Sequence, residues 1–138
     1  MSLLQLELFY TIGLLIFAIV WLQSGISKLI DFKGELAYFK QQFKSTWGIK
    51  HMIKESLILI TLLEIGSGLL QIAAIYNLWT SQDLNLSYWA SLASLLTLFS
   101  LITGQRMAKD YAGAQGIMVY VTAALAFLYI LQAIGLNT

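Results

Sequence analysis

The sequence predicts an all-α fold, a four-helix transmembrane bundle with a cytoplasmic amphipathic segment between the first two spanning helices. Hydrophobic residues make up 59% of the 138 residues and charged residues only 11%, whereas a soluble domain is typically about 25% charged. The apolar residues also form four blocks of nearly uncharged sequence, each long enough to cross a hydrocarbon core of about 30 Å. The length and the lack of a linker favour one domain over residues 1–138.

The four blocks predict spans at about residues 8–30, 56–79, 86–104 and 116–136. The first carries no charge before Lys28, and the seven residues that precede it contain no Lys or Arg. A secretory signal peptide has a basic start and a shorter apolar core, so we expect this segment to be a retained helix. The second span carries one charge, Glu64, and the third and fourth carry none.

The long connection after the first span predicts a short amphipathic helix. Asp31 is a suitable N-cap and Glu35 follows in the first turn. Apolar residues then recur at spacings of three and four, at Leu36, Phe39, Phe43 and Trp47. Gly48 is expected to end the helix. Such a helix either lies at the cytoplasmic lipid interface or packs under the bundle as a lid, and both roles are compatible.

The basic residues predict the orientation in the membrane. They are Lys28, Lys33, Lys40, Lys44, Lys50, Lys54, Arg106 and Lys109. With four spans all eight lie on one side, because the first and third connections share a side of the membrane. The positive-inside rule makes that side cytoplasmic and places both termini on the outer side.

Composition also limits the chemistry that the chain can perform. The absence of cysteine excludes disulfides and thiolate metal sites, and a single histidine excludes a bis-histidine haem or a His-rich metal site. A net charge of +1 provides no basic field for nucleic acid. No phosphate-binding loop and no Ser/His/Asp arrangement is present, so we expect no intrinsic cofactor and no self-sufficient catalytic site.

Glu64 is the charged residue that most needs an explanation. Carboxylates inside a membrane are costly and are usually paired or functional. Gly68 and Gln71 fall on the same helical face, which predicts that Glu64 faces the bundle interior. Lys28 and Arg106 are both long enough to neutralise it from the cytoplasmic ends of their spans. Glu64 is therefore either part of a structural pair or a proton-accepting or ligand-binding carboxylate.

A second set of polar residues lies in the third connection. Its members are Gln105, Arg106, Asp110 and Tyr111. Arg106 and Asp110 can form an ion pair if the turn is helical. The topology places this set near Lys28, which predicts a polar mouth for a headgroup, a quinone carbonyl or an anion. The alternative is a cytoplasmic cap whose polar groups satisfy one another.

These segments resemble the DoxX family of small bacterial membrane proteins. The matching motifs are residues 25–29 (GISKL), 64–69 (EIGSGL), 104–106 (GQR) and 109–113 (KDYAG). Together with the four spans, the likeness covers nearly the whole chain. The family is similar to the small membrane subunit of an archaeal thiosulfate:quinone oxidoreductase. The resemblance implies a bacterial membrane protein that acts with a protein partner, and we expect it in the cytoplasmic membrane. A homo-oligomer is the alternative, which a carrier would need because four spans are few for alternating access.

The leading functional hypothesis is a membrane subunit of a quinone-linked oxidoreductase, with quinone as a possible bound cofactor. Its candidate ligand and proton site comprises Glu64, Lys28, Arg106, Asp110, Gln105, Tyr111 and Gln71. One alternative is a non-catalytic assembly or anchoring subunit. Another is a small carrier of a lipid or an apolar solute, since bundles can bind apolar ligands between their helices.

Overall fold

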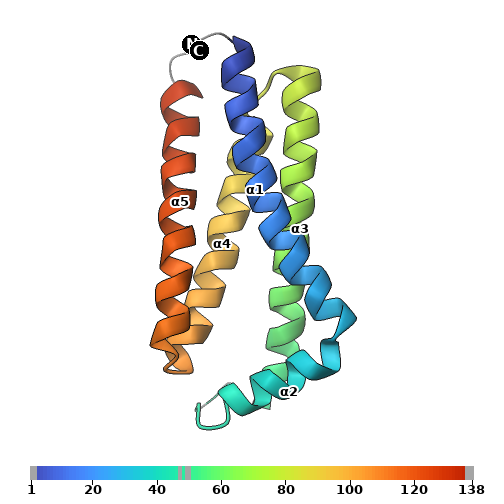
Figure 1. The fold of residues 1–138 in the computed structure, drawn as a ribbon, viewed down its shortest axis with the longest axis vertical. Coiled ribbons are helices and arrows are strands. Elements are labelled where there is room, and N and C mark those ends of the chain that lie inside the picture. The colour runs from blue at the N-terminus through green and yellow to red at the C-terminus, as the bar shows by residue number, and fades with distance from the viewer. Residues whose placement is uncertain (1–2, 47, 49–50, 136–138) are drawn as a thin grey trace.

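The fold is all-α, as the sequence predicts. The computed structural model describes residues 3–46, 48 and 51–135. Its five α-helices are α1 (Leu3–Ile30), α2 (Phe32–Gln42), α3 (Ile53–Ser81), α4 (Asn85–Met107) and α5 (Tyr111–Gly135). Figure 1 shows four long helices side by side, with both chain ends at one end of the bundle and α2 at the other. We call these the terminal end and the α2 end.

The four long helices are each long and apolar enough to cross a membrane. Many large apolar side chains on them are exposed, among them Ile16 on α1, Leu62 on α3, Phe99 on α4 and Val119 on α5. Exposed apolar surface of this extent is costly in water and normal in lipid. The protein is therefore a multi-pass membrane protein whose outer surface contacts the bilayer.

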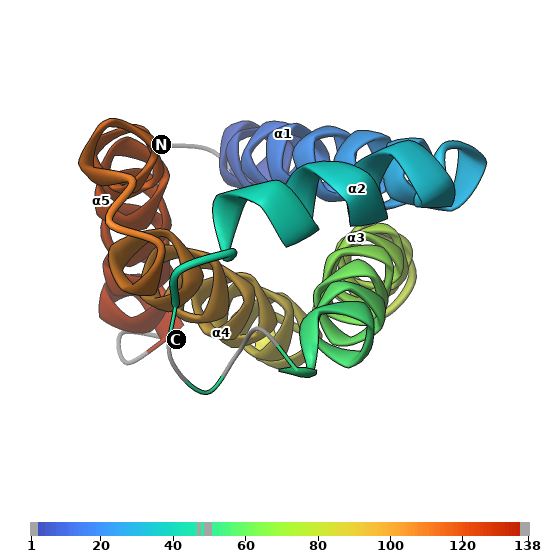
Figure 2. The ribbon, with the colours of Figure 1, turned by 90° about the horizontal axis from the view of Figure 1, so that it is seen from below.

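The helices pack in the order α1, α3, α4, α5 around the bundle. Viewed from the α2 end, α2 lies across the bundle beneath α1 and α3 (Figure 2). Helices α1 and α3 approach closely where Gly68 faces Leu22, because glycine has no side chain. A Cβ at this position would lie only 3.1 Å from the Leu22 backbone nitrogen. Small residues are the usual means of close helix approach in membranes.

The helices extend beyond the predicted spans, by five residues at the starts of α1 and α5 and by three at the start of α3 and the end of α4. The third connection is predicted over residues 104–116, but α4 continues to Met107 and α5 begins at Tyr111. Lys109 makes the turn with a φ of 59°. Asp110 caps α5, since its Oδ1 accepts a hydrogen bond of 2.9 Å from the Gly113 N–H. The glycines of this stretch therefore lie within helices instead of forming a loop, Gly104 near the end of α4 and Gly113 and Gly116 near the start of α5.

The amphipathic segment agrees with the prediction at its start and differs at its end. Asp31 caps α2 by accepting a hydrogen bond from the Gly34 N–H. The helix ends at Gln42, before Gly48, because the chain turns to bury Phe43 and Thr46. The Thr46 hydroxyl donates to the Met107 carbonyl at 3.4 Å.

Helix α2 contacts α1 and α3 at the end of the bundle, which fits the role of a lid. Gly48 adopts a φ of 88° in the turn that follows. Two residues used in the predictions, Trp47 of the apolar stripe and Lys50 of the basic set, lie outside the described residues. The seven other basic residues all lie at the α2 end.

Candidate functional site

Lys28 and Glu64 form a buried ion pair between α1 and α3. The Lys28 Nζ lies 3.0 Å from Glu64 Oε1, to which it donates a hydrogen bond, and 3.0 Å from Oε2. It also donates to the Ser24 Oγ at 2.8 Å, and the Ser24 hydroxyl donates to Glu64 Oε1 at 3.0 Å. The three side chains thus form a closed triangle of charge-assisted hydrogen bonds, the strong kind.

The local sequence explains why these three groups meet. Ser24 and Lys28 are one helical turn apart, so they lie on the same face of α1. Gly25 lies between them, and a Cβ there would approach the Ile65 backbone nitrogen to 3.2 Å. The absence of that Cβ lets α1 approach α3 next to Glu64. Glu64 itself lies three turns into α3, about 16 Å from its first residue at about 1.5 Å per residue.

The pair is enclosed but only partly satisfied. The side chains of Glu64 and Lys28 are 1% and 12% exposed. Glu64 Oε2 is buried and accepts no hydrogen bond, because the ammonium is near it without being aligned with it. A buried carboxylate oxygen that lacks a donor is costly. It is therefore the atom of this site most suited to accept a proton or a ligand hydroxyl.

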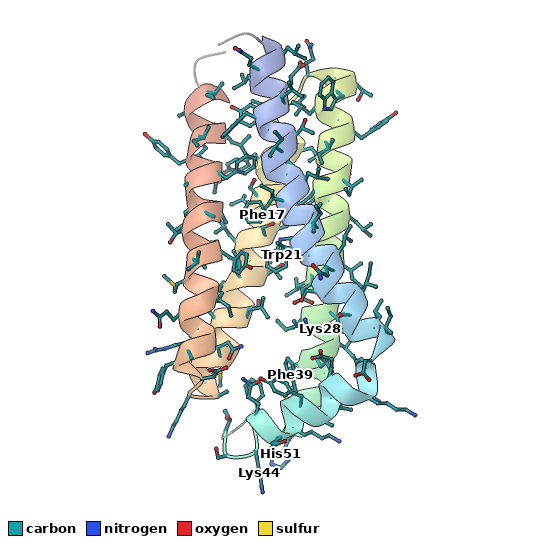
Figure 3. The ribbon with its side chains drawn as sticks, viewed as in Figure 1. Phe17, Trp21, Lys28, Phe39, Lys44 and His51 are labelled. Atoms are coloured by element: carbon teal, nitrogen blue, oxygen red, sulfur yellow. The ribbon has the colours of Figure 1, made fainter. Side chains whose placement is uncertain are left out.

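A cavity of about 460 Å³ adjoins the ion pair. All five helices line it: Val20, Trp21, Gln23, Ser24, Ser27 and Lys28 from α1, Glu35 from α2, Glu64 from α3, Leu98 and Leu101 from α4, Ile117 and Tyr120 from α5. Its wall is mostly apolar toward α4 and α5 and polar toward α1 and α3. Figure 3 labels Lys28 on the part of α1 that borders this space.

The cavity opens between α1 and α5. In the terminal half of the bundle the two helices meet, since Phe127 packs against Phe17 and Tyr10 and fits over Gly13, where a Cβ would clash with it. Toward the α2 end their ribbons diverge (Figure 1). The rim residues Gln23, Ser27 and Tyr120 are exposed. The flanks of this opening are two of the helices that are long and apolar enough to span a membrane.

The seven predicted site residues do not form one cluster. Glu64 and Lys28 line the cavity between α1 and α5, whereas Arg106 and Tyr111 line a separate groove between α4 and α5. Gln105 and Asp110 are joined by Gln42 of α2, whose Nε2 lies 3.2 Å from both Gln105 Oε1 and Asp110 Oδ2. The polar residues predicted to gather near Lys28 therefore lie at three separate places. Lys28, not Arg106, neutralises Glu64.

The predicted Arg106–Asp110 ion pair is also absent from the described part of the chain, in which Lys28–Glu64 is the one salt bridge. The residues between them form a turn with a left-handed Lys109, so the helical spacing that would join them is lost. The Arg106 guanidinium lies over the Tyr111 ring instead, 4.8 Å from its centroid.

Gln71 belongs to a buried polar seam between α3 and α4. Its Nε2 donates to the Ala90 carbonyl at 3.0 Å and to the Ser94 Oγ at 2.8 Å, and the Trp21 indole N–H also donates to Ser94. Next along the seam the hydroxyls of Ser67 and Thr97 lie 2.8 Å apart. Gln71 therefore holds helices together and does not line the cavity.

Several lining or bridging residues were not anticipated. Ser24 could have been found, since a hydroxyl one turn before Lys28 on an apolar helix is a usual hydrogen-bond partner. Glu35, Gln42 and Tyr120 could not, because only the placement of α2 and the divergence of α5 bring them to these positions.

Over the described residues no group of three or more His, Asp or Glu side chains is positioned to hold a metal ion. Comparison of the chain with models of known protein families, with curated proteins and with solved structures finds no match.

Proposed function

We propose that this chain is a quinone-binding membrane subunit of an oxidoreductase complex, of the DoxX type that its motifs resemble. The observation that carries the proposal is that the one ion pair in the described chain borders a cavity whose exposed rim residues lie on two of the apolar spanning helices. Both members of the pair line this cavity, so a molecule bound there would contact their polar atoms.

The residues present fit a quinone headgroup. At one end of the cavity the Lys28 ammonium offers a donor for a quinone carbonyl, and Glu64 Oε2 offers an acceptor for a quinol hydroxyl. Leu98, Leu101 and Ile117 offer an apolar wall for a flat ring. An isoprenoid tail would leave through the opening between α1 and α5 into the bilayer.

A bound quinone would supply two-electron redox chemistry, with the electrons exchanged with a redox group of a partner protein. The chain's own residues would hold the quinone headgroup and exchange protons with it. Lys28 would donate a hydrogen bond to a carbonyl oxygen, and Glu64 Oε2 would take up one of the two protons that a quinol loses on oxidation, or supply one of the two that a quinone gains on reduction. Glu35 on α2 lines the same cavity and offers the next carboxylate toward the α2 end.

The proposed location is the cytoplasmic membrane of a bacterium. The seven described basic residues lie at the α2 end, and Glu7 and Asp83 lie at the terminal end. The positive-inside rule then places α2 in the cytoplasm and both termini outside.

Fluorescence of Trp21 tests the proposal, because this indole lines the cavity. The chain has four tryptophans, so replacing Trp47, Trp79 and Trp89 by Phe leaves Trp21 as the single reporter. Titration of this variant in nanodiscs with a short-chain quinone is expected to quench the emission saturably.

Adding Lys28→Met together with Glu64→Gln removes the polar end of the cavity without leaving an unpaired charge. We expect the apparent Kd to rise at least about tenfold, which is about 1.4 kcal/mol of binding free energy. Arg106→Gln is the matched control outside the cavity and should leave the Kd unchanged. Linear quenching that is equal in all variants would mean that quinone is only dissolved in the lipid, and would favour an anchoring subunit.

A further inference from the structure

A second groove lies on the outside of the bundle between α4 and α5, at the α2 end. It encloses about 730 Å³. Arg106 and Tyr111 line the part nearest the helix ends, Ala114 and Gln115 lie about one turn further along α5, and Ile102 and Met118 line the deepest part. The groove therefore runs from an apolar floor at membrane depth to a polar, cationic rim.

Arg106 carries a positive charge that no carboxylate of the described residues neutralises. The nearest acid in the sequence, Asp110, is engaged elsewhere, because its Oδ1 accepts from the Gly113 N–H and its Oδ2 from Gln42. The Arg106 side chain is exposed. The face of Tyr111, 4.8 Å below the guanidinium, holds its plane while the edge N–H groups stay free to donate.

The position of Arg106 along α4 defines the depth of this charge. It lies in the last turn of a helix long and apolar enough to span a membrane. An arginine at such a helix end lies at the level of lipid headgroups, where phosphate groups are the abundant anions. Arginine also binds phosphate bidentately through two parallel N–H donors.

From this geometry we propose that the α4–α5 groove is a binding site for one anionic glycerophospholipid. The phosphodiester binds the Arg106 guanidinium, and the Gln115 amide lies about one turn further along α5, where it can donate to the glycerol oxygens. An acyl chain lies along Ile102, Ala114 and Met118. The site is separate from the Lys28–Glu64 cavity and stands whether or not that cavity binds quinone.

Native mass spectrometry of the delipidated full chain tests the proposal directly. Dioleoylphosphatidylglycerol is titrated onto the protein, with dioleoylphosphatidylcholine as the zwitterionic comparison. We expect one phosphatidylglycerol to bind saturably and more tightly than phosphatidylcholine. Arg106→Gln should weaken that binding at least about tenfold.

Lys109→Gln is the matched control. It removes the same charge three residues further along the chain, from a side chain that does not line the groove. It should weaken binding less than about twofold. Equal losses in the two variants, or equal affinity for both lipids, would mean diffuse charge attraction and would overturn the proposal.

A third arm separates the lipid from its headgroup. Glycerol 3-phosphate, which has no acyl chain, should not displace phosphatidylglycerol at equal concentration. Efficient displacement would refute the claim that the groove binds an acyl chain. Helix content and unfolding midpoint, followed by circular dichroism, should be the same for Arg106→Gln and wild type. If the variant is destabilised, Tyr111→Leu, which removes the stacking face but keeps the charge, is expected to weaken binding several-fold, and unchanged binding would overturn the proposal.

Discussion

Replacing Lys28 by Met should be among the most destabilising single changes that remove a charge from this protein. The substitution keeps a long side chain on α1 but removes the ammonium that lies 3.0 Å from both Glu64 carboxylate oxygens. Glu64 is 1% exposed, so water replaces the lost partner only in small part. Ser24 then remains as its one hydrogen-bond donor.

The magnitude follows from the geometry of the pair. Two unit charges 3.0 Å apart attract by about 5–6 kcal/mol at an effective dielectric constant of about 20. Desolvation offsets much of that attraction in the intact pair, but a variant with one partner removed keeps the desolvation cost of the other. Breaking a buried pair typically costs about 3–5 kcal/mol, which we expect for Lys28→Met.

A double-mutant cycle isolates the interaction. Glu64→Gln keeps an acceptor for Ser24 and leaves an ammonium that is 12% exposed, so its cost should be smaller, about 1.5–3 kcal/mol. The double variant has no unpaired charge and should be destabilised by about 2–3 kcal/mol less than the sum of the single changes. The free energy of unfolding is measured by titration with sodium dodecyl sulfate and followed by circular dichroism.

Lys54→Met is the control, because Lys54 is exposed at the start of α3 and should change stability by less than about 0.5 kcal/mol. The reasoning is refuted if Lys28→Met costs less than about 1 kcal/mol and the two single changes simply add. That result would mean that the ion pair does not form in the membrane.

Three further changes test the packing. Ser94→Ala removes the hydroxyl oxygen that accepts hydrogen bonds from both the Trp21 indole and the Gln71 amide. It should lower the free energy of unfolding by about 1–2 kcal/mol and shift the Trp21 emission. An unchanged emission spectrum would contradict the hydrogen bond. Gly68→Val should cost about 1–3 kcal/mol by forcing α1 away from α3, whereas Gly66→Val, at a position with no neighbouring atom within 4 Å, should cost less than about 0.5 kcal/mol. Asp110→Ala removes the α5 cap and should cost about 1 kcal/mol, with faster amide hydrogen exchange in the first turn of α5; equal exchange in variant and wild type would argue against the cap.

The long helices could be predicted from sequence because their determinants are local. Uninterrupted apolar runs define the spans, and the Asp31 cap fixes the start of α2. The ends of α4 and α5 were less accessible, because three glycines in one stretch are typical of a loop. The cap provided by Asp110 and the left-handed turn at Lys109 depend on a backbone geometry that composition does not specify.

The candidate site was predictable only in part, for a similar reason. The isolation of Glu64 within an apolar span singles it out, and Lys28 was one of two cations within reach of it. Sequence alone cannot distinguish them, since both lie at the same end of the bundle. The choice depends on the close approach of α1 to α3 and on the orientation of Arg106 toward Tyr111, on the far side of α4.

The cavity itself depends on where α1 and α5 separate, which follows from packing over their whole length. Phe127 holds the two helices together in the terminal half of the bundle. Beside Lys28 no such aromatic contact joins them, because Ile117 and Tyr120 of α5 line the cavity and Tyr120 is exposed. A helix-by-helix reading of the sequence cannot show such an opening.

The most direct test of the central claim is photolabelling of the protein in native membranes with a diazirine-bearing quinone, followed by peptide mapping. The account predicts labels on residues 20–28 of α1 and 117–120 of α5, which flank the opening of the cavity. Excess unlabelled quinone should suppress those labels, and so should the double change at Lys28 and Glu64. Labels spread over the lipid-facing surfaces of all four long helices, insensitive to competition, would contradict it.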